Sequence, residues 1–285
     1  MDIFTVINCV VNGLMIFPSI TGNFFVLFAI VASSSLHSAS NVFLCNLAVS
    51  DLLVGFAMQP VYIAYGLVTK SRPILTITAR LIFGVCCGVS LCLMTALSVD
   101  RFLTLHYHLL YPNMMTQKRA LYVSFSLWFI AIALSAFSLW HGSQAVLAIA
   151  ILICFIVSCF SYVRIYQIVR HHRSVIQSQQ VSVQRVSTSL AIKSAINTFI
   201  YFICMVFCYF PMFTSMLIYT INPGVSSEYW TITNTFVFMN SSLNPLLYCW
   251  RLRELRSAVS KKMRKMLCKQ TDETPRIPVF TLQQK

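Results

Sequence analysis

The sequence predicts an all-α membrane protein, built as a bundle of seven transmembrane helices, and three observations carry this prediction. Of the 285 residues, 58% are hydrophobic and 10% are charged, and the mean hydropathy is +0.75. Seven apolar stretches with few charged residues are long enough to cross a hydrocarbon core, which takes roughly 20 helical residues. The basic residues are unevenly distributed among the segments that join these stretches. This composition excludes most soluble enzymes, and it excludes a nucleic-acid binder, which would be polar throughout.

Polar breaks along the chain define the helices in order. The polar run at 33–38 separates the first two helices, and the uncharged stretch from Leu121 to Val163 holds two crossings joined by a short turn at 141–143. A polar stretch at 177–180 precedes the sixth helix, and Asn222-Pro223-Gly224 marks a turn before the seventh. The predicted helices cover residues 4–32, 41–67, 76–105, 119–140, a fifth that ends near 170, 187–220 and 228–250.

The distribution of Lys and Arg predicts the orientation. Seven crossings place Lys70, Arg72 and Arg80 on one side and the other 18 of the 21 basic residues on the opposite side. Because cytoplasmic loops collect basic residues, we expect an extracellular N-terminus and a cytoplasmic C-terminus. The first apolar run follows the acidic start Met1-Asp2 and is too long for a signal peptide, so we expect it to remain as a helix.

The 11 cysteines lie almost entirely inside apolar stretches. Their spacing matches neither a disulfide framework nor a metal site. We interpret them as small buried hydrophobic residues.

Two acidic residues, Asp51 and Asp100, fall inside the predicted bundle, where a charge is costly and usually functional. The residues alone leave two readings of Asp51 open, a protonated side chain in a neutral hydrogen-bonded network and a cation site. Candidate polar partners on other helices are Asn23, Ser90, Asn240, Ser241 and Asn244.

Asp100-Arg101-Phe102 ends the third predicted helix. One interpretation is a pair of charges that reach the membrane surface. The other is a cation held by its neighbouring acid until a cytoplasmic partner replaces that contact. Spacing does not decide between them.

Short motifs recur once in each predicted helix, and together they resemble those of the rhodopsin-like (class A) G-protein-coupled receptors. The resemblance covers about residues 20–260, and the order of the motifs leaves little room for coincidence. The motifs are Gly22-Asn23, Leu47-Ala48-x-x-Asp51, Asp100-Arg101-Phe102, Trp128, Tyr162, Cys208-Tyr209-Phe210-Pro211 and Asn244-Pro245-Leu246-Leu247-Tyr248.

The resemblance implies an allosteric sodium ion and no other cofactor. It assigns the ion to a pocket around Asp51, which favours the ion-site reading. The matching residues are Asp51, Ser90, Asn240, Ser241 and Asn244.

The resemblance also implies a location in the plasma membrane and coupling to a heterotrimeric G protein. Arg101 would contact the G protein once the sixth helix swings outward, and Leu109 would dock on it. Pro211 would kink the sixth helix because proline removes a hydrogen bond of the helix. The residues that match the activation switch are Asp100, Arg101, Leu109, Tyr162, Tyr209, Pro211, Pro245 and Tyr248.

Beyond the seventh helix, residues 251–267 resemble the family's membrane-lying eighth helix, with apolar residues at helical spacing between basic ones. We therefore divide the chain into a receptor domain at 1–250, this amphipathic helix and a short cytoplasmic tail at 268–285. Cys268 is equally compatible with palmitoylation and with a free thiol.

Several departures from the family's usual motifs indicate which group of receptors within it the chain resembles. The second outer loop is almost absent and has no cysteine, and Cys154 stands where the fifth helix usually has proline. These features resemble the melanocortin, lysophospholipid, cannabinoid and adenosine receptor group in architecture. Ala191 carries no acid to hold Arg101, so the family's ionic lock cannot form and we expect elevated basal signalling.

The ligand is not identified by the sequence, and a small molecule, a lipid and a peptide remain open. Acidic residues that hold peptide in melanocortin receptors are replaced here by Val61, Thr76 and Arg80. A basic rim over an apolar cavity favours an anionic amphiphile such as a fatty acid. The predicted pocket residues are Arg80, Phe83, Cys87, Tyr209, Phe213, Trp230, Asn234 and Phe238.

Two alternatives to a signalling receptor remain. An ion-coupled transporter or channel would also use an intramembrane acid such as Asp51, although the sequence has neither an internal repeat nor a pair of broken helices. A receptor-like chain that has lost signalling is the other, and the intact Arg101 and Asn244-Pro245 motifs count against it.

Overall fold

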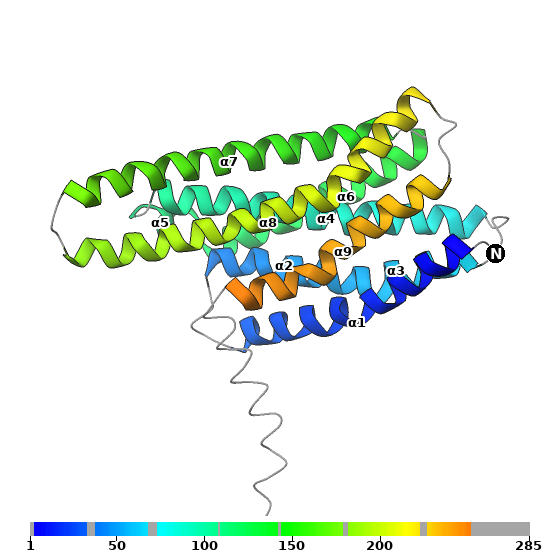
Figure 1. The fold of residues 1–285 in the computed structure, drawn as a ribbon, viewed down its shortest axis with the longest axis horizontal. Helices are drawn as coiled ribbons and strands as arrows, with labels where there is room; N and C mark the ends of the chain where they lie inside the picture. The colour runs from blue at the N-terminus through cyan, green and yellow to red at the C-terminus, as the bar shows by residue number, and fades with distance from the viewer. Residues whose placement is uncertain are drawn as a thin grey trace, which may run out of the picture.

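The computed structural model describes residues 3–32, 38–67, 73–107, 109–141, 144–178, 182–222 and 227–251. Within these ranges the chain is helical, with short turns and no strands. Long helices lie side by side in one bundle (Figure 1). The predicted all-α bundle of seven membrane-crossing helices is confirmed.

The membrane-crossing helices follow one another along the chain. The first is α1 (Ile3–Val31). The second is continuous through α2 (Ala39–Leu53), a π-helical turn η2 (Val54–Met58) and α3 (Gln59–Leu67). The remaining helices of the described ranges are α4 (Pro73–His106), the short α5 (Tyr111–Met114), α6 (Gln117–His141), α7 (Ala145–Ser178), α8 (Ser182–Ile221) and α9 (Ser227–Arg251).

The fifth and sixth crossings are longer than predicted. Helix α7 continues to Ser178, past the expected end near 170, and α8 begins at Ser182 instead of 187. Polar residues end a membrane-spanning stretch, but they do not end a helix, because Gln and Arg are good helix formers. The predicted helix at 251–267 and the tail with Cys268 lie outside the described residues.

Six of the described helices are long and apolar enough to cross a membrane by composition alone. Helix α9 is less apolar, with 25 residues that include buried Asn240, Ser241 and Asn244. These polar side chains face the interior of the bundle, where other helices supply hydrogen-bonding partners. At about 1.5 Å per residue, α9 is still long enough to cross a hydrocarbon core.

The π-helical turn in the second crossing has a local cause. The N–H group of Gln59 bonds to the carbonyl of Val54, five residues back instead of four. Pro60 follows directly, and a proline ring has no N–H group and clashes with the carbonyl four residues before it. The extra residue accommodates Pro60 within a continuous helix.

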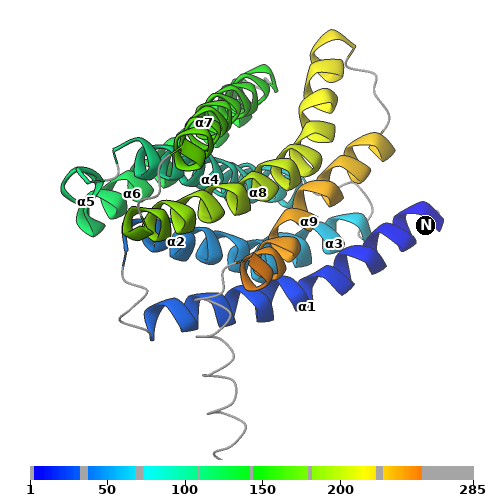
Figure 2. The ribbon, with the colours of Figure 1, turned by 60° about the vertical axis from the view of Figure 1, so that its left-hand side comes forward.

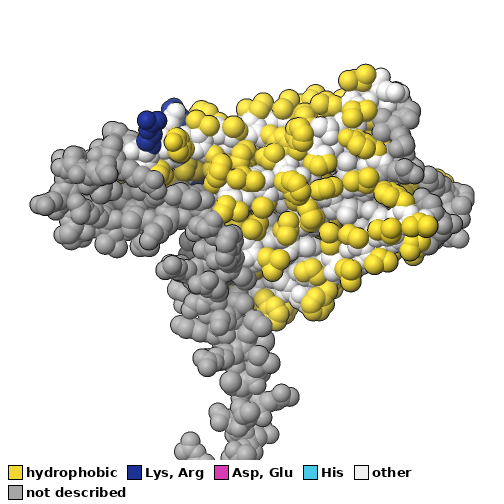
Figure 3. Space-filling model, in the orientation of Figure 1, with side chains coloured by type: hydrophobic (Ala, Val, Ile, Leu, Met, Phe, Trp, Pro, Cys, Tyr) yellow, Lys and Arg dark blue, Asp and Glu magenta, His cyan; other side chains and the backbone are white. Residues whose placement is uncertain are grey.

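Helix α4 lies at the centre of the bundle, where it packs against α2, α6, α7 and α8 (Figure 2). The core around it buries large apolar side chains such as Phe43 of α2, Leu93 of α4 and Phe238 of α9. The outer surface is also apolar, and on one face Lys and Arg side chains of the described residues appear only near one end (Figure 3). We call the end that carries Arg101 the Arg101 end and the opposite one the Ile3 end.

Candidate functional site

The carboxylate of Asp51 is the centre of a polar cluster at the middle of the bundle. Asp51 is fully buried, and its Oδ1 accepts hydrogen bonds from the hydroxyl groups of Ser90 at 3.0 Å and Ser241 at 2.8 Å. Its Oδ2 accepts one from Nδ2 of Asn244 at 2.8 Å. Three helices, α2, α4 and α9, therefore meet at one carboxylate.

Further polar residues surround this cluster. Asn23 of α1 donates to the carbonyls of Ser19 at 2.8 Å and Ser241 at 3.0 Å. The hydroxyl of Ser50 lies 2.6 Å from that of Ser90, a contact that sequence reasoning missed because Ser50 matches no motif. Asn240 donates to the sulfur of Met94 at 3.4 Å, so it lies beside the cluster without bonding to Asp51.

The residues around Asp51 fit a sodium ion by charge and by ligand type. The three donors to the carboxylate are neutral, so among the described residues no cation balances the charge of an ionised Asp51. The buried Oδ1 atoms of Asn23, Asn240 and Asn244 have no hydrogen-bond partner. Carboxylate, amide and hydroxyl oxygens are the ligands that hard cations prefer.

At the Arg101 end, Asp100 is held by hydroxyl groups. Ser40, at the start of α2, donates to Oδ2 of Asp100 at 2.5 Å, and Tyr111 of α5 donates to Oδ1. Asp100 and Arg101 form no ion pair with each other among the described contacts. The carboxylate thus joins α2, α4 and α5, an arrangement that the sequence motif alone did not predict.

The contact with Asp100 changes the acidity of Tyr111, which lies outside the membrane-spanning segments. Burial, the negative charge of Asp100 and the hydrogen bond that it accepts raise the pKa of Tyr111 to about 12. The phenol group therefore stays protonated and keeps donating to Asp100 under physiological conditions.

Arg101 is half-buried, and no hydrogen bond or ion pair of its side chain is found among the described residues. It lies close enough to Tyr162 of α7 to interact with it electrostatically. The hydroxyl of Ser98 donates to Tyr162 at 3.3 Å, and the ring of Tyr162 packs on Phe202 of α8 with centroids 4.9 Å apart. An arginine and an aromatic cluster therefore lie where α4, α7 and α8 approach one another.

Helices α8 and α9 are joined at this end by Tyr201, which the sequence motifs did not reveal. Its hydroxyl donates to the carbonyl of Leu247 at 3.3 Å. Leu247 lies next to Tyr248, a predicted switch residue whose side chain lies outside the described set, as does that of Ala191. The bond therefore connects α8 to α9 at the Arg101 end.

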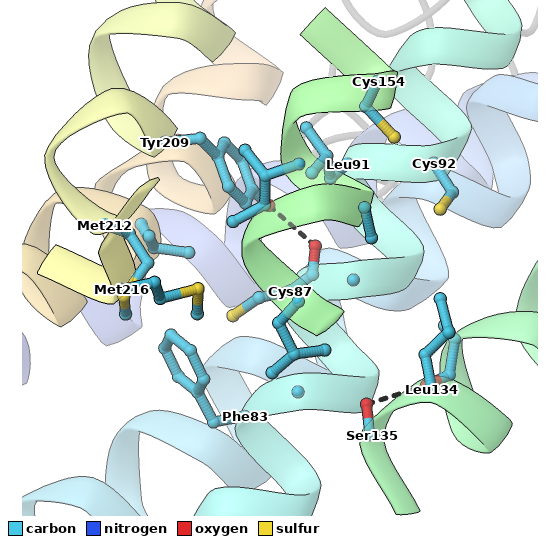
Figure 4. Close-up of a pocket in the computed structure, with 17 residues that line it drawn as sticks. Phe83, Cys87, Leu91, Cys92, Leu134, Ser135, Cys154, Tyr209, Met212 and Met216 are labelled. Atoms are coloured by element: carbon cyan, nitrogen blue, oxygen red, sulfur yellow. Dashed lines mark hydrogen bonds between the residues drawn. The ribbon is translucent and has the colours of Figure 1, made fainter. Parts of the chain in front are cut away.

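The remaining predicted switch residues differ in their burial and in where they lie in the bundle. Pro211 and Pro245 lie inside α8 and α9. Leu109 is 86% exposed in the turn between α4 and α5, where a partner can reach it. Tyr209 is fully enclosed, and its hydroxyl donates to the carbonyl of Cys87 at 2.9 Å, which ties α8 to α4 (Figure 4).

An apolar pocket lies toward the Ile3 end of the bundle, with about 550 Å³ of empty space including its open side. Its walls come from α4, α6, α7, α8 and α9 (Figure 4). Of the predicted pocket residues, Phe83, Cys87 and Tyr209 line it. The other lining residues are Gly84, Gly88, Leu91, Cys92, Ala131, Leu134, Ser135, Leu147, Ala150, Ile151, Cys154, Met212, Met216 and Val237.

The other five predicted pocket residues do not line this pocket. Arg80 is exposed, because a guanidinium group keeps its hydration where no acceptor is offered. The ring of Phe238 packs against Tyr62 and Phe83 instead. The ring of Phe213 packs against Phe155 and Phe210, and that of Trp230 packs against Tyr219. Asn234 is half-buried on α9.

Comparison with known proteins agrees with this arrangement. The family model described as "7 transmembrane receptor (rhodopsin family)" matches residues 22–146 and 138–248. Melanocortin receptor 5 of Mus musculus is 28% identical over 84% of this chain and 78% of the relative. Melanocortin receptor 4 of Danio rerio has the same identity and coverage, and melanocortin receptor 3 of Homo sapiens is 27% identical over 88% of this chain and 82% of its own length.

Proposed function

Because the chain belongs to the rhodopsin family of seven-transmembrane receptors, we propose that it binds a ligand within the bundle and activates a heterotrimeric G protein at the Arg101 end. The chain is a multi-pass membrane protein and a G-protein-coupled receptor related to the melanocortin group, and it is not an enzyme. The ligand, the G protein and the orientation in the membrane belong to the proposal.

The observation that carries the proposal is the state of Arg101. A half-buried guanidinium group is costly to keep away from water when it has no described hydrogen-bond or ion-pair partner. Arg101 can therefore donate hydrogen bonds to a partner that reaches it. Hydroxyl groups already hold the neighbouring Asp100, which leaves Arg101 available for backbone carbonyls or a carboxylate of a partner. An outward movement of α8 would expose it.

A switch of this kind requires an element that can occupy two positions, and the contacts of α8 make it that element. Tyr201 joins α8 to α9, and Tyr209 joins it to α4 through the wall of the apolar pocket. Pro211 lies just beyond Tyr209 and weakens the helix there. A ligand that alters the packing of Tyr209 would therefore shift the Arg101 end of α8, because the helix swings about Pro211.

We further propose that a sodium ion occupies the Asp51 site in the inactive state. Asp51, Ser90 and Ser241 would hold it with their oxygen atoms, and the unpaired amide oxygens of Asn240 and Asn244 are available nearby. The ion would balance the buried carboxylate and hold α2, α4 and α9 together.

The basic residues favour placing the Arg101 end in the cytoplasm of a plasma-membrane protein, as the charge distribution predicts. The Ile3 end would then face the cell exterior.

The test is a panel of G-protein biosensors in cells that express the full chain at a verified surface level. We expect the chain to activate at least one G protein, Arg101→Ala to abolish that signal, and Arg164→Ala to retain it. Arg164 is a suitable control because it is an exposed arginine of α7 that packs over the ring of Phe160. No coupling to any G protein would overturn the proposal, and a sodium-dependent current would favour a channel or transporter instead.

A further inference from the structure

Helices α6 and α7 are separated by a seam with few contacts across it. These two helices contact each other less than any other two consecutive membrane-crossing helices. The apolar pocket lies directly behind this seam, since Leu134 and Ser135 of α6 and Leu147 and Ala150 of α7 are among its walls. Few side chains therefore separate the pocket from the hydrocarbon core of a bilayer.

Two glycines of α4 let α6 pack closely beside the pocket. Gly84 and Gly88 line the pocket, and a Cβ atom would lie 2.6 Å from Oγ of Ser135 at Gly84 and 3.5 Å from the Cβ of Ala131 at Gly88. The backbone of α4 thus meets α6 directly, and these two positions present no side chain to the pocket.

The pocket offers nothing to a polar ligand. Its lining residues include no charged side chain. The two hydroxyl groups in its walls are already engaged, because Ser135 donates to the carbonyl of Ala131 at 2.7 Å and Tyr209 to that of Cys87 at 2.9 Å. A peptide backbone or charged headgroup placed here would lose its hydrogen bonds to water without replacement.

The length of the pocket suits a chain-like occupant. Phe83 and Cys92 lie at opposite ends of the lining along α4, nine residues apart, which corresponds to roughly 13 Å of helix. Figure 4 shows Cys92 and Cys154 together at one end and Phe83 toward the other, with Tyr209 and Met212 along one side.

We propose that the hydrocarbon chain of a neutral membrane lipid enters between α6 and α7 and occupies this pocket. The proposal rests on the proposed function, because it names the chemical class of the ligand that the receptor reads. It replaces the expected anionic amphiphile, since Arg80 is exposed and lies outside the lining. The polar end of the lipid stays at the seam, where water and headgroups can hydrogen-bond to it.

Occupancy of the pocket bears on signalling through α8. Tyr209, Met212 and Met216 form its α8 wall. A chain packed against these side chains competes with the contact between Tyr209 and Cys87, which holds α8 against α4. The same chain therefore binds between the helices and biases the position of α8.

The experiment uses the full chain in phosphatidylcholine nanodiscs that contain a long-chain fatty alcohol with a diazirine group in its middle. After illumination, mass spectrometry identifies the labelled residues. We expect label on pocket residues of α6 and α7, such as Leu134 and Ile151, and loss of that label when unlabelled fatty alcohol is added in excess. Label confined to outward residues such as Phe137, or label that excess alcohol does not reduce, would overturn the proposal.

Paired variants on α7 test the location. Ala150→Phe places a ring in the pocket and should reduce its labelling by about tenfold, as expected from overfilling a packed site. Ile149→Phe adds a ring on the exposed side of the same helix and should leave pocket labelling unchanged. Equal labelling of both variants, with thermal unfolding showing that both fold, would count against the site.

Nucleotide exchange on G protein, measured in the same nanodiscs, separates this inference from the proposed function. Competed label in the pocket without any exchange activity would support the lipid site and overturn the receptor proposal. Exchange activity without pocket labelling would overturn the lipid site and leave the receptor proposal intact.

Discussion

Gly22 of α1 lies so close to Pro245 of α9 that a Cβ atom at position 22 would be 2.6 Å from the Cβ of Pro245. Asn23, the next residue, donates to the carbonyl of Ser241 one turn away on α9. The absent side chain of Gly22 therefore lets the first and last helices meet beside the Asp51 cluster. Neither residue's motif indicated this contact.

We predict that Gly22→Ala destabilises the receptor by about 1–3 kcal/mol, the usual effect of overfilling a packed site. The added methyl group would push α9 away, because the atoms it meets belong to a rigid proline ring. The measurement is thermal unfolding of purified receptor in detergent. Gly13→Ala is the matched control on the same helix, since nothing lies within 4 Å of a Cβ there. Equal melting temperatures for both variants would contradict the prediction.

Sodium is expected to suppress basal signalling through Asp51. In proteoliposomes, replacing potassium by sodium at constant ionic strength should lower ligand-free nucleotide exchange, because an ion at the proposed site would stabilise the arrangement of α2, α4 and α9 around the carboxylate. Asp51→Asn removes the charge while keeping the shape, and its exchange rate should not respond to the cation. A sodium effect that persists in this variant would exclude Asp51 as the site.

Much of the fold follows from the sequence because a bilayer imposes simple rules on length and polarity. The apolar stretches predicted every crossing, and α6 ends at His141 and α7 begins at Ala145, close to the turn predicted at 141–143. The π-helical turn before Pro60 was not predicted, since a proline inside a membrane helix is accommodated in more than one way. How it is accommodated depends on packing against neighbouring helices.

The Asp51 cluster was easier to predict than the pocket. A buried carboxylate must find donors, so polar residues on adjacent helices were natural candidates, and Ser90, Ser241 and Asn244 do contact Asp51. Apolar pocket residues carry no such requirement. A phenylalanine such as Phe238 can either line a cavity or pack against other rings. The sequence pattern does not distinguish these outcomes, and in the structure Phe238 packs against Tyr62 and Phe83.

Tyr111→Phe is expected to weaken coupling without abolishing it. Loss of the donor to Asp100 releases α5, which follows the exposed Leu109, so the concentration of G protein at half-maximal exchange should rise by about three- to tenfold. Tyr107→Phe is the matched control because its half-exposed ring lies nearby and its hydroxyl has no described partner. An unchanged half-maximal concentration for Tyr111→Phe would show that the contact does not position α5.

The contact between Tyr111 and Asp100 also predicts that the effect of Tyr111→Phe on nucleotide exchange does not change with pH over the physiological range. The raised pKa of Tyr111, about 12, means that the folded protein favours the protonated phenol. Its stabilising contribution is therefore complete below about pH 10, the pKa of an unperturbed tyrosine, and is lost as the pH rises through about 12. The ratio of exchange rates for wild type and Tyr111→Phe should stay constant below about pH 10. A ratio that drifts across neutral pH would point to a different titrating group.

Tyr201→Phe should raise basal signalling. Its hydroxyl donates to the carbonyl of Leu247 at 3.3 Å, a bond that outward movement of α8 must break. A hydrogen bond of this kind contributes about 0.5–1.5 kcal/mol, so its loss should increase the active population by about two- to tenfold. The measurement is nucleotide exchange on G protein without ligand, with Tyr122→Phe as a control because Tyr122 is 72% exposed on the outer surface of α6. Unchanged basal exchange in Tyr201→Phe would show that the bond to Leu247 does not restrain α8, and that other contacts, such as those of Tyr162 with Phe202 and of Tyr209 with Cys87, hold the helix in place.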